Sequence, residues 1–189
     1  MIWAEKPAKM TEAQQKVEEV LRRYEVPLLQ YTARITGNNE RARDVVQEAF
    51  IKFVGSATNG AGPPEKTATW LFTVCRNGAL NVCRKERRIM FLEEEIIESQ
   101  RDCQPMPFER MEQREASGFL MKILATLPAR QQEVLQLKFQ NDLSYQQIAE
   151  ITKTTVNSVG VLIHTALKTL RQKYGEASKD FISFNPRTT

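Results

Sequence analysis

The sequence contains little cysteine and histidine. Three cysteines and one histidine occur among its 189 residues, without a CxxC pair or a Cys/His cluster. These numbers exclude a disulfide framework and the usual zinc sites. If Cys75 and Cys83 share a helix, they lie about 12 Å apart, which is too far for a disulfide bond. We therefore expect reduced thiols, no metal site and no cofactor.

Long apolar segments and catalytic motifs are also missing. No apolar run approaches the ~18 residues that a membrane-spanning helix needs, and the first ten residues lack the apolar stretch of a signal peptide. We expect a cytoplasmic protein without membrane insertion. The sequence holds neither a Ser–His–Asp set nor a glycine-rich phosphate loop that ends in lysine. It is therefore not expected to be an enzyme.

Charged residues divide the chain into three parts. Residues 1–90 carry a net charge of +5, residues 91–115 carry −5 and residues 116–189 carry +4. Basic segments suggest a polyanionic partner. The acidic segment also holds Pro105 and Pro107, which indicates a linker between two small domains or a solvated spacer without a further role.

Apolar residues at spacings of three and four predict an all-α fold of two small helical domains. The expected domains are 12–90 and 116–175, with the acidic linker 91–115 between them and a tail at 176–189 that is expected to fray. The helices expected from the pattern cover about 11–37, 38–55, 67–88, 119–127, 128–139, 144–151 and 155–170.

Local signals set several of these helix ends. Thr11 with Gln14, and Ser144 with Gln147, match the capping-box pattern of a helix start. We also expect Asn38 and Thr155 to cap helices and Gly37 and Gly55 to end them. The glycine- and proline-rich stretch 55–66 is expected to be irregular.

Residues 144–170 have the layout of a helix-turn-helix, with an ordinary pair of antiparallel helices as the alternative. In a helix-turn-helix the second helix enters the major groove and presents its outer N-terminal side chains to base edges. The candidate DNA-reading residues are Thr155, Asn157, Ser158, Gly160, Val161, His164 and Thr165.

The helix expected at 67–88 has a basic polar side. Cations neutralise phosphates and asparagine bonds base edges, so this side is a candidate nucleic-acid surface. A merely solvated basic face is the alternative. Trp70 could stack on an unpaired base, but it falls on the apolar side and is expected in the core. The polar side carries Arg76, Asn77, Asn81, Arg84, Lys85, Arg87 and Arg88.

A third pattern lies on the helix expected at 38–55. Asp44, Gln47 and Glu48 share one face of this helix because they are spaced by three and four residues. Lys52 follows one turn later. This polar face is suited to docking a basic helix of a partner.

Four segments together resemble bacterial extracytoplasmic-function (ECF) sigma factors of the sigma-70 family. They are RDVVQEAFIKF (43–53), TWLFTVCRNGALNVCRKERR (69–88), LPARQQEVLQLKF (127–139) and LSYQQIAEITKTTVNSVGVLIHTALKTLRQK (143–173). The resemblance covers about residues 12–175. It implies a promoter-specificity subunit that binds core RNA polymerase and directs transcription initiation at −10 and −35 promoter elements.

The resemblance also implies roles for particular residues. The first domain would bind the β′ clamp helices through Asp44, Gln47, Glu48 and Lys52. It would open the −10 element with the 55–66 loop and with Asn77, Asn81, Arg84, Lys85 and Arg88. The second domain would bind the β flap and read the −35 element with the helix that starts near Val156. The linker would thread towards the RNA exit path.

Two departures from the family pattern affect these expectations. Arg41 and Arg43 stand where acidic residues are common, so the clamp face is expected to need another negative charge. Phosphorylation of Ser56 or Thr58 by a Ser/Thr kinase would add one; the alternative is regulation by an anti-sigma factor. Positions that are often basic in the recognition helix are here Gly160, Leu162, Thr165 and Leu167. We therefore predict a −35 preference without a bidentate Arg–guanine contact.

Two rival functions stay open at this point. A stand-alone helix-turn-helix regulator would bind operators without polymerase, but it leaves the first half of the chain unused. A polymerase-binding interaction protein without promoter reading would explain the recognition helix that lacks arginine.

Overall fold

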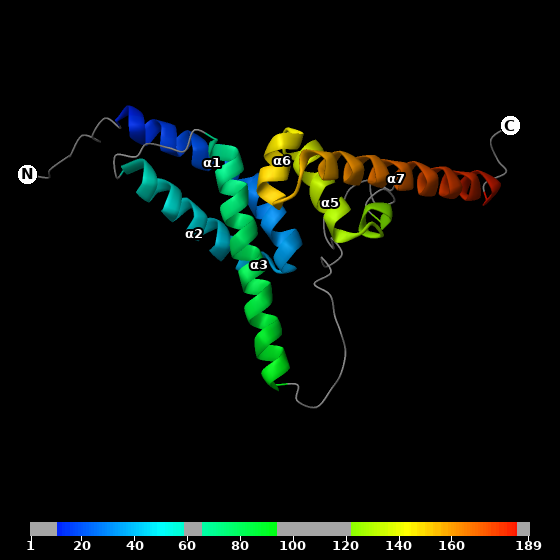
Figure 1. Ribbon diagram of the computed structural model, residues 1–189, viewed down its shortest axis with the longest axis horizontal. Coiled ribbons are helices and arrows are strands. Elements are labelled where there is room, and N and C mark those ends of the chain that lie inside the picture. Colours follow the sequence, from blue (N-terminus) through cyan, green and yellow to red (C-terminus); the bar gives the residue numbers. More distant parts are fainter. Residues whose placement is uncertain (1–10, 59–65, 94–121, 185–189) are drawn as a thin grey trace, which may run out of the picture.

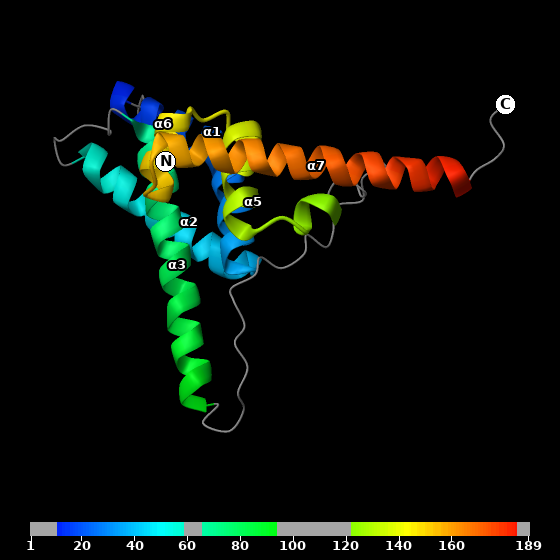
Figure 2. The same ribbon diagram turned by 45° about the vertical axis from the view of Figure 1, so that its right-hand side comes forward.

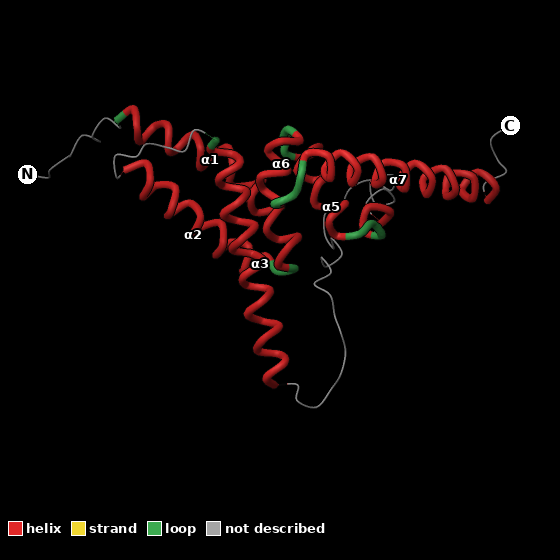
Figure 3. The backbone as a smooth tube through the Cα atoms, in the orientation of Figure 1, coloured by secondary structure: helices red, strands yellow, loops and turns green. Residues whose placement is uncertain are grey.

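The computed structural model describes residues 11–58, 66–93 and 122–184, and every regular element in these ranges is helical (Figure 3). The all-α prediction is confirmed. Residues 122–125 form one helical turn within the helix expected at 119–127. The longer elements are α1 (Glu12–Thr36), α2 (Asn39–Thr58), α3 (Thr67–Glu93), α5 (Ala129–Leu135), the π-helical segment η1 (Gln136–Gln140), α6 (Tyr145–Thr152) and α7 (Val156–Phe184).

Helices α1, α2 and α3 pack around a shared apolar core (Figures 1 and 2). Tyr31 of α1 and Phe72 of α3 meet edge to face, with ring centroids 5.3 Å apart, a favourable arrangement for aromatic pairs. Phe53 of α2 lies against Trp70, with centroids 6.2 Å apart. Trp70 therefore packs against the core, as the sequence predicted.

The ends of α1 and the start of α2 follow the predicted local signals. The Gln14 N–H donates to Thr11 Oγ1 (3.3 Å) and the Thr11 N–H donates to Gln14 Oε1 (2.8 Å), which completes a capping box. Gly37 ends α1 with a left-handed φ of 65°. The Asn38 side chain then accepts from the Glu40 N–H at 2.8 Å and caps α2.

In the second half of the described chain, α6 and α7 form a helix-turn-helix. Ser144 and Gln147 form a second capping box at the start of α6. Lys153 makes the turn with a left-handed φ of 55°, and Thr155 caps α7 by accepting from the Ser158 N–H at 3.1 Å. The buried apolar side chains of this half include Val134, Leu137, Ile148, Ile151, Val159 and Ile163.

Helices α2 and α3 continue past their predicted ends. Gly55 does not stop α2, which runs to Thr58, because a single glycine costs a helix only about 1 kcal/mol. The expectation that residues 55–66 are irregular is therefore wrong for 55–58, and 59–65 lie outside the described residues. Helix α3 extends to Glu93, into the acidic segment, because glutamate is a good helix former.

The expectation of a frayed C-terminal segment is also wrong over most of its length. Helix α7 continues to Phe184. No proline interrupts the sequence before Pro186, and the residues between include helix formers such as Ala177 and Lys179. Helix α7 thus reaches well beyond the body of the molecule (Figure 1).

The two halves of the chain lie against each other. Helix α6 packs beside α3 in both views (Figures 1 and 2). Side-chain hydrogen bonds also cross between the halves: Tyr31 and Arg76 both donate to Glu133, and Lys66 donates to Glu150. The structure is therefore a closed arrangement of the two helical units.

Candidate nucleic-acid and polymerase interface

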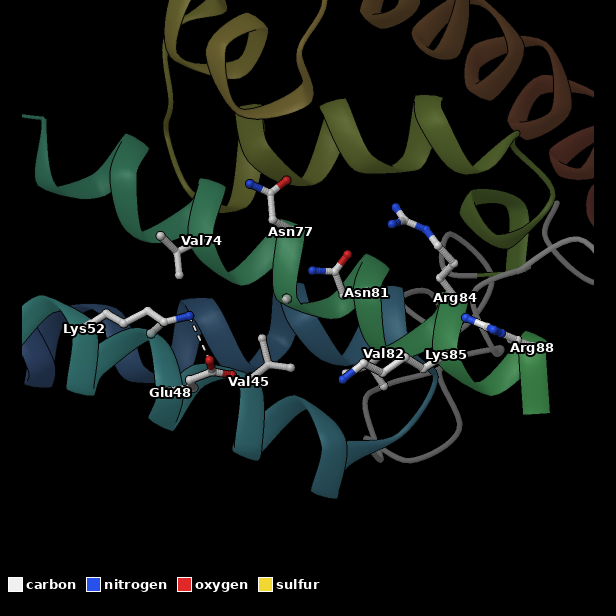
Figure 4. A pocket seen from close by; sticks show the side chains of 12 residues that line it. Val45, Glu48, Lys52, Val74, Asn77, Asn81, Val82, Arg84, Lys85 and Arg88 are labelled. Atoms are coloured by element: carbon white, nitrogen blue, oxygen red, sulfur yellow. Dashed lines mark ion pairs between the residues drawn. The ribbon is translucent and has the colours of Figure 1, made fainter. Parts of the chain in front are cut away.

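A groove of about 570 Å³ runs between α2 and α3 (Figure 4). Its floor is formed by small and apolar side chains, while its rim carries carboxylate, amide and cationic groups. The lining residues are Val45, Glu48, Ala49, Lys52, Val74, Asn77, Gly78, Asn81, Val82, Arg84, Lys85 and Arg88. The groove thus brings together residues that the sequence assigned to two different predicted surfaces.

The basic side of α3 lies along one edge of this groove. All five residues predicted for the −10 element line it, at spacings that keep them on one face of the helix (Figure 4). Asn77 is half-buried, and the other four are exposed: Asn81, Arg84, Lys85 and Arg88. Two amides and three cations therefore face the same space, a combination that can bond base edges and neutralise phosphates.

The predicted clamp face lies on α2, and two of its residues, Glu48 and Lys52, line the opposite edge of the groove. Asp44, Gln47 and Glu48 are all exposed. Lys52 Nζ donates to Glu48 Oε1 at 2.8 Å (Figure 4). This hydrogen bond, and then the charge of Lys52, lower the pKa of Glu48. Glu48 is therefore a carboxylate at neutral pH, and Lys52 offsets part of its charge.

The two arginines that depart from the family pattern have different surroundings. Arg41 forms an ion pair with Glu86 of α3, so its charge is balanced within the protein. Arg43 is exposed and has no ion-pair partner among the residues that the structure describes. Only Arg43 thus adds an uncompensated positive charge beside Asp44.

The sequence position of Arg76 places it with the basic side of α3, but in the structure its side chain contacts α5 instead. Its guanidinium donates to Glu133 of α5, with Nε 2.7 Å from Oε1. The side chains of Arg76 and Glu133 are only 17% and 16% exposed. Arg76 therefore belongs to the contact between the two halves. Sequence reasoning missed Glu133, because nothing local marks a partner 57 residues away.

The predicted recognition helix presents its outer face to solvent. Asn157, Ser158, Val161, His164 and Thr165 are exposed, and Gly160 is half-buried beside Tyr145. Thr155 is exposed as well, but its hydroxyl serves the cap of α7 and lies 2.8 Å from Ser158 Oγ.

Two of the positions where the family often has basic residues face inward here. Leu162 and Leu167 pack against the buried core. A basic residue at either position would not point with Asn157 and Val161. The missing arginines at 162 and 167 therefore reflect packing, whereas Thr165 is a polar residue on the exposed face.

Some large apolar side chains of α7 and η1 are exposed, and of these the sequence analysis singled out only Val161 as functional. Val156 and Val161 of α7 are 47% and 64% exposed, and Phe139 of η1 is 62% exposed. Single exposed apolar residues are common on protein surfaces, so Val156 and Phe139 do not by themselves mark a functional site. The exposure of Val156 and Phe139 could not be predicted from the sequence, because apolar residues in these helices are partly buried and partly exposed.

The predicted phosphorylation sites are only partly covered by the structure. Ser56 is half-buried, and its hydroxyl donates to the Phe53 carbonyl at 2.8 Å. The side chain of Thr58 lies outside the described residues. Within the described ranges, no group of His, Cys, Asp and Glu side chains could hold a metal ion. None of the described helices is long and apolar enough to span a membrane.

Comparison with known proteins decides the family. Two protein-family models match this chain. The model "Sigma-70 region 2" matches residues 20–89, and the model "Sigma-70, region 4" matches residues 120–170. The sigma factor SigV of Bacillus subtilis is 30% identical over 134 residues, covering 71% of this chain and 76% of SigV. The chain is an ECF sigma factor of the sigma-70 family.

Further relatives agree with this assignment. The ECF sigma factor SigW of Bacillus subtilis is 25% identical over 158 residues, covering 79% of this chain and 84% of SigW. A solved complex of the sigma factor RpoE with the anti-sigma factor NepR from Bartonella quintana has the same fold. The match has a TM-score of 0.58 at 22% identity and covers 86% of this chain and 96% of that one.

This family assignment accounts for both halves of the chain. Helices α1–α3 correspond to region 2 and α5–α7 to region 4. Sigma factors bind core RNA polymerase and promoter DNA to start transcription, and they are initiation factors rather than catalysts. The stand-alone operator-binding regulator is set aside, because it left region 2 without a role.

Proposed function

We propose that region 2 uses the two edges of the α2–α3 groove for two partners. The exposed acidic face of α2, with Asp44, Gln47 and Glu48, docks the β′ clamp helices of the polymerase. The opposite edge holds the −10 element. The observation that carries this proposal is the groove itself, which gathers five DNA-binding candidates of α3 beside α2.

On the α3 edge, amide and cationic side chains bind different parts of the DNA. Asn77 and Asn81 bond base edges, which carry the sequence information. Arg84, Lys85 and Arg88 neutralise phosphates of the strand and set its register. The segment between α2 and α3 receives a flipped base. Extruding a base costs a few kcal/mol, which contacts in such a pocket offset.

Region 4 reads the −35 element with the exposed face of α7. The first turns of α7 enter the major groove, and α6 lies across the backbone. Asn157 suits adenine, and Val161 suits the methyl group of thymine. Ser158, His164 and Thr165 lie along the same exposed side. Region 4 also binds the β flap.

Residues 12–90 form the region 2 domain, 116–175 the region 4 domain and 176–189 the C-terminal tail. The acidic linker 91–115 threads towards the RNA exit path. The protein acts in the cytoplasm, has no catalytic activity of its own and needs no cofactor.

The activity of the sigma factor is regulated by a partner protein or by a covalent modification. An anti-sigma factor is the simpler means. Phosphorylation of Ser56 or Thr58 by a Ser/Thr kinase would add about −1.5 to −2 charges near the clamp face. It would offset the uncompensated charge of Arg43.

A matched pair of arginine variants tests the DNA-binding edge. Arg84→Ala should weaken promoter complexes of the holoenzyme and reduce the slope of log affinity against log salt by about one. Arg22→Ala removes a cation of α1 that is paired with Glu18 and 82% exposed, and it should leave the slope unchanged. Equal slopes for both variants would contradict the assignment of Arg84 to phosphate.

A further inference from the structure

One carboxylate joins region 4 to two helices of region 2. Glu133 of α5 accepts from Tyr31 Oη of α1 at 2.8 Å and from Arg76 Nε of α3 at 2.7 Å. Arg76 Nη2 also donates to its second oxygen at 3.4 Å. Tyr31 is fully buried, and the Arg76 and Glu133 side chains are mostly buried. Both Glu133 oxygens therefore have partners across the boundary between the halves.

The electrostatics of this contact favour its bonded form. Burial, followed by the charge and hydrogen bond of Glu133, raises the pKa of the Tyr31 phenol well above its ordinary range. The phenol thus keeps its proton as a donor. Burial is the largest single influence on the pKa of Arg76 and lowers it, but the hydrogen bond and charge of Glu133, together with those of Tyr31, raise this pKa by more in sum.

The second ion pair between the halves is of a different kind. Lys66 Nζ lies 2.8 Å from Glu150 of α6, but the side chains are 60% and 38% exposed. Exposed pairs contribute little stability. Removing one partner of a buried pair is far more damaging, because it leaves the other charge without compensation. The closed arrangement therefore depends on Glu133 rather than on Glu150.

The closed arrangement conflicts with promoter binding. The −10 and −35 elements lie about 25 base pairs apart, a span of about 85 Å at ~3.4 Å per base pair. In this structure the first helix of the helix-turn-helix packs against α3, the helix that carries the −10 residues. The two regions cannot read both elements while these helices touch.

We propose that Glu133, Tyr31 and Arg76 form an autoinhibitory latch that holds region 4 against region 2 in the free sigma factor. The latch opens before or during binding to the polymerase, which separates the two regions. The consequence for transcription rests on the proposed promoter-binding function. The existence of the latch does not rest on that function, because the latch is a property of the free chain.

Distances between two spin labels in the full-length chain test the latch directly. Nitroxides are attached at Glu19 of α1 and Lys168 of α7, both exposed, after Glu19→Cys and Lys168→Cys in a Cys103→Ser background. The unmodified latch should give one narrow distance population, set by the closed arrangement, in pulsed electron paramagnetic resonance. Glu133→Gln should shift the open-to-closed ratio by about tenfold or more, because the buried Arg76 loses its counter-charge.

Two further variants serve as controls. Glu18→Gln removes a carboxylate from an exposed pair within α1, and it should leave the distance unchanged. The swapped pair Glu133→Arg with Arg76→Glu should restore the narrow closed-state distance that each single change loses. Circular dichroism of every variant reports whether the helices stay folded. An unchanged distance in folded Glu133→Gln, or a broad distribution in the starting protein, would overturn the latch.

The rate of association with core polymerase tests the inhibitory role. Glu133→Gln should associate several-fold faster than the starting protein, and Glu18→Gln should not. Opening of the label distance without faster association would overturn the inhibitory role. If no variant bound core polymerase, the proposed function would fail, and the distance measurement would still decide the latch.

Discussion

Gly78 of α3 lies directly against Val45 of α2, so that a β-carbon on Gly78 would be 2.8 Å from Val45 Cγ1. Real β-carbons do not approach so closely. The missing side chain at position 78 therefore lets the two helices approach closely at the floor of the groove between the clamp face and the basic side of α3. The stiff β-branched side chain of Val45 has little freedom to move aside.

This relationship predicts the effect of Gly78→Ala. Alanine gains about 1 kcal/mol of helix propensity, but overpacking costs about 1–3 kcal/mol, so we expect a net loss of about 1 kcal/mol in the free energy of unfolding. Gly55→Ala is the control, since no atom lies within 4 Å of its added carbon, and it should stabilise. Urea denaturation measures both variants. Equal stabilisation by the two would show that the helices do not meet as described.

Local signals in the sequence predicted the helix starts well. The capping boxes at Thr11 and Ser144 each depend on two residues three positions apart. The sequence pattern therefore predicts the hydrogen-bonded geometry directly. Helix ends were harder. Gly55 only weakly disfavours a helix. The residues next to it do not show that α2 continues past this position, where no other atom lies near the glycine.

Contacts between distant residues could not be predicted. Arg76 shares the polar side of α3 with Asn77, and the sequence alone gives no reason to separate them. The separation arises because α5 brings Glu133 to Arg76 and not to the other cations of α3. Likewise, Arg41 was expected to weaken the clamp face, and only the packing of α2 on α3 brings Glu86 to it.

The two arginines of the clamp face should respond differently to substitution. Arg43→Glu replaces an uncompensated cation next to Asp44, and it should tighten binding to core polymerase about two- to fivefold at low salt. Arg41→Asp should give a smaller gain, because it also leaves Glu86 without its partner. Equilibrium binding to labelled core measures both. Absence of any gain for Arg43→Glu would refute the idea that this face lacks negative charge.

Stability should depend on pH through Tyr31. Its pKa in the folded protein is raised well above the ordinary value of about 10 that it has when unfolded. The contribution is therefore complete below about pH 10 and is lost as the pH rises through the folded pKa. Absorbance at 295 nm should show one of the four tyrosines ionising late, together with unfolding. Joint ionisation of all four near pH 10 would contradict the burial of Tyr31.

Promoter preference should depend on Asn157. Asn157→Ala removes the amide that suits adenine, and it should reduce discrimination at one −35 position by about tenfold (about 1.4 kcal/mol), at the lower end of the ~1–3 kcal/mol of a good bidentate contact. Gln30→Ala, an exposed amide change on α1, should leave promoter preference unchanged. Competition between promoter variants for the holoenzyme measures the effect. A uniform loss across all sequences would assign Asn157 to the backbone instead.

The most direct test of the account is transcription from a library of randomised promoters, using purified bacterial core polymerase with and without this protein. We predict factor-dependent transcripts from a two-part motif, with a −35 element that lacks strong dependence on guanine. Core binding without any transcripts would contradict promoter reading and favour an interaction protein or a missing activating modification. A strongly guanine-dependent −35 element would contradict the role assigned to the exposed face of α7.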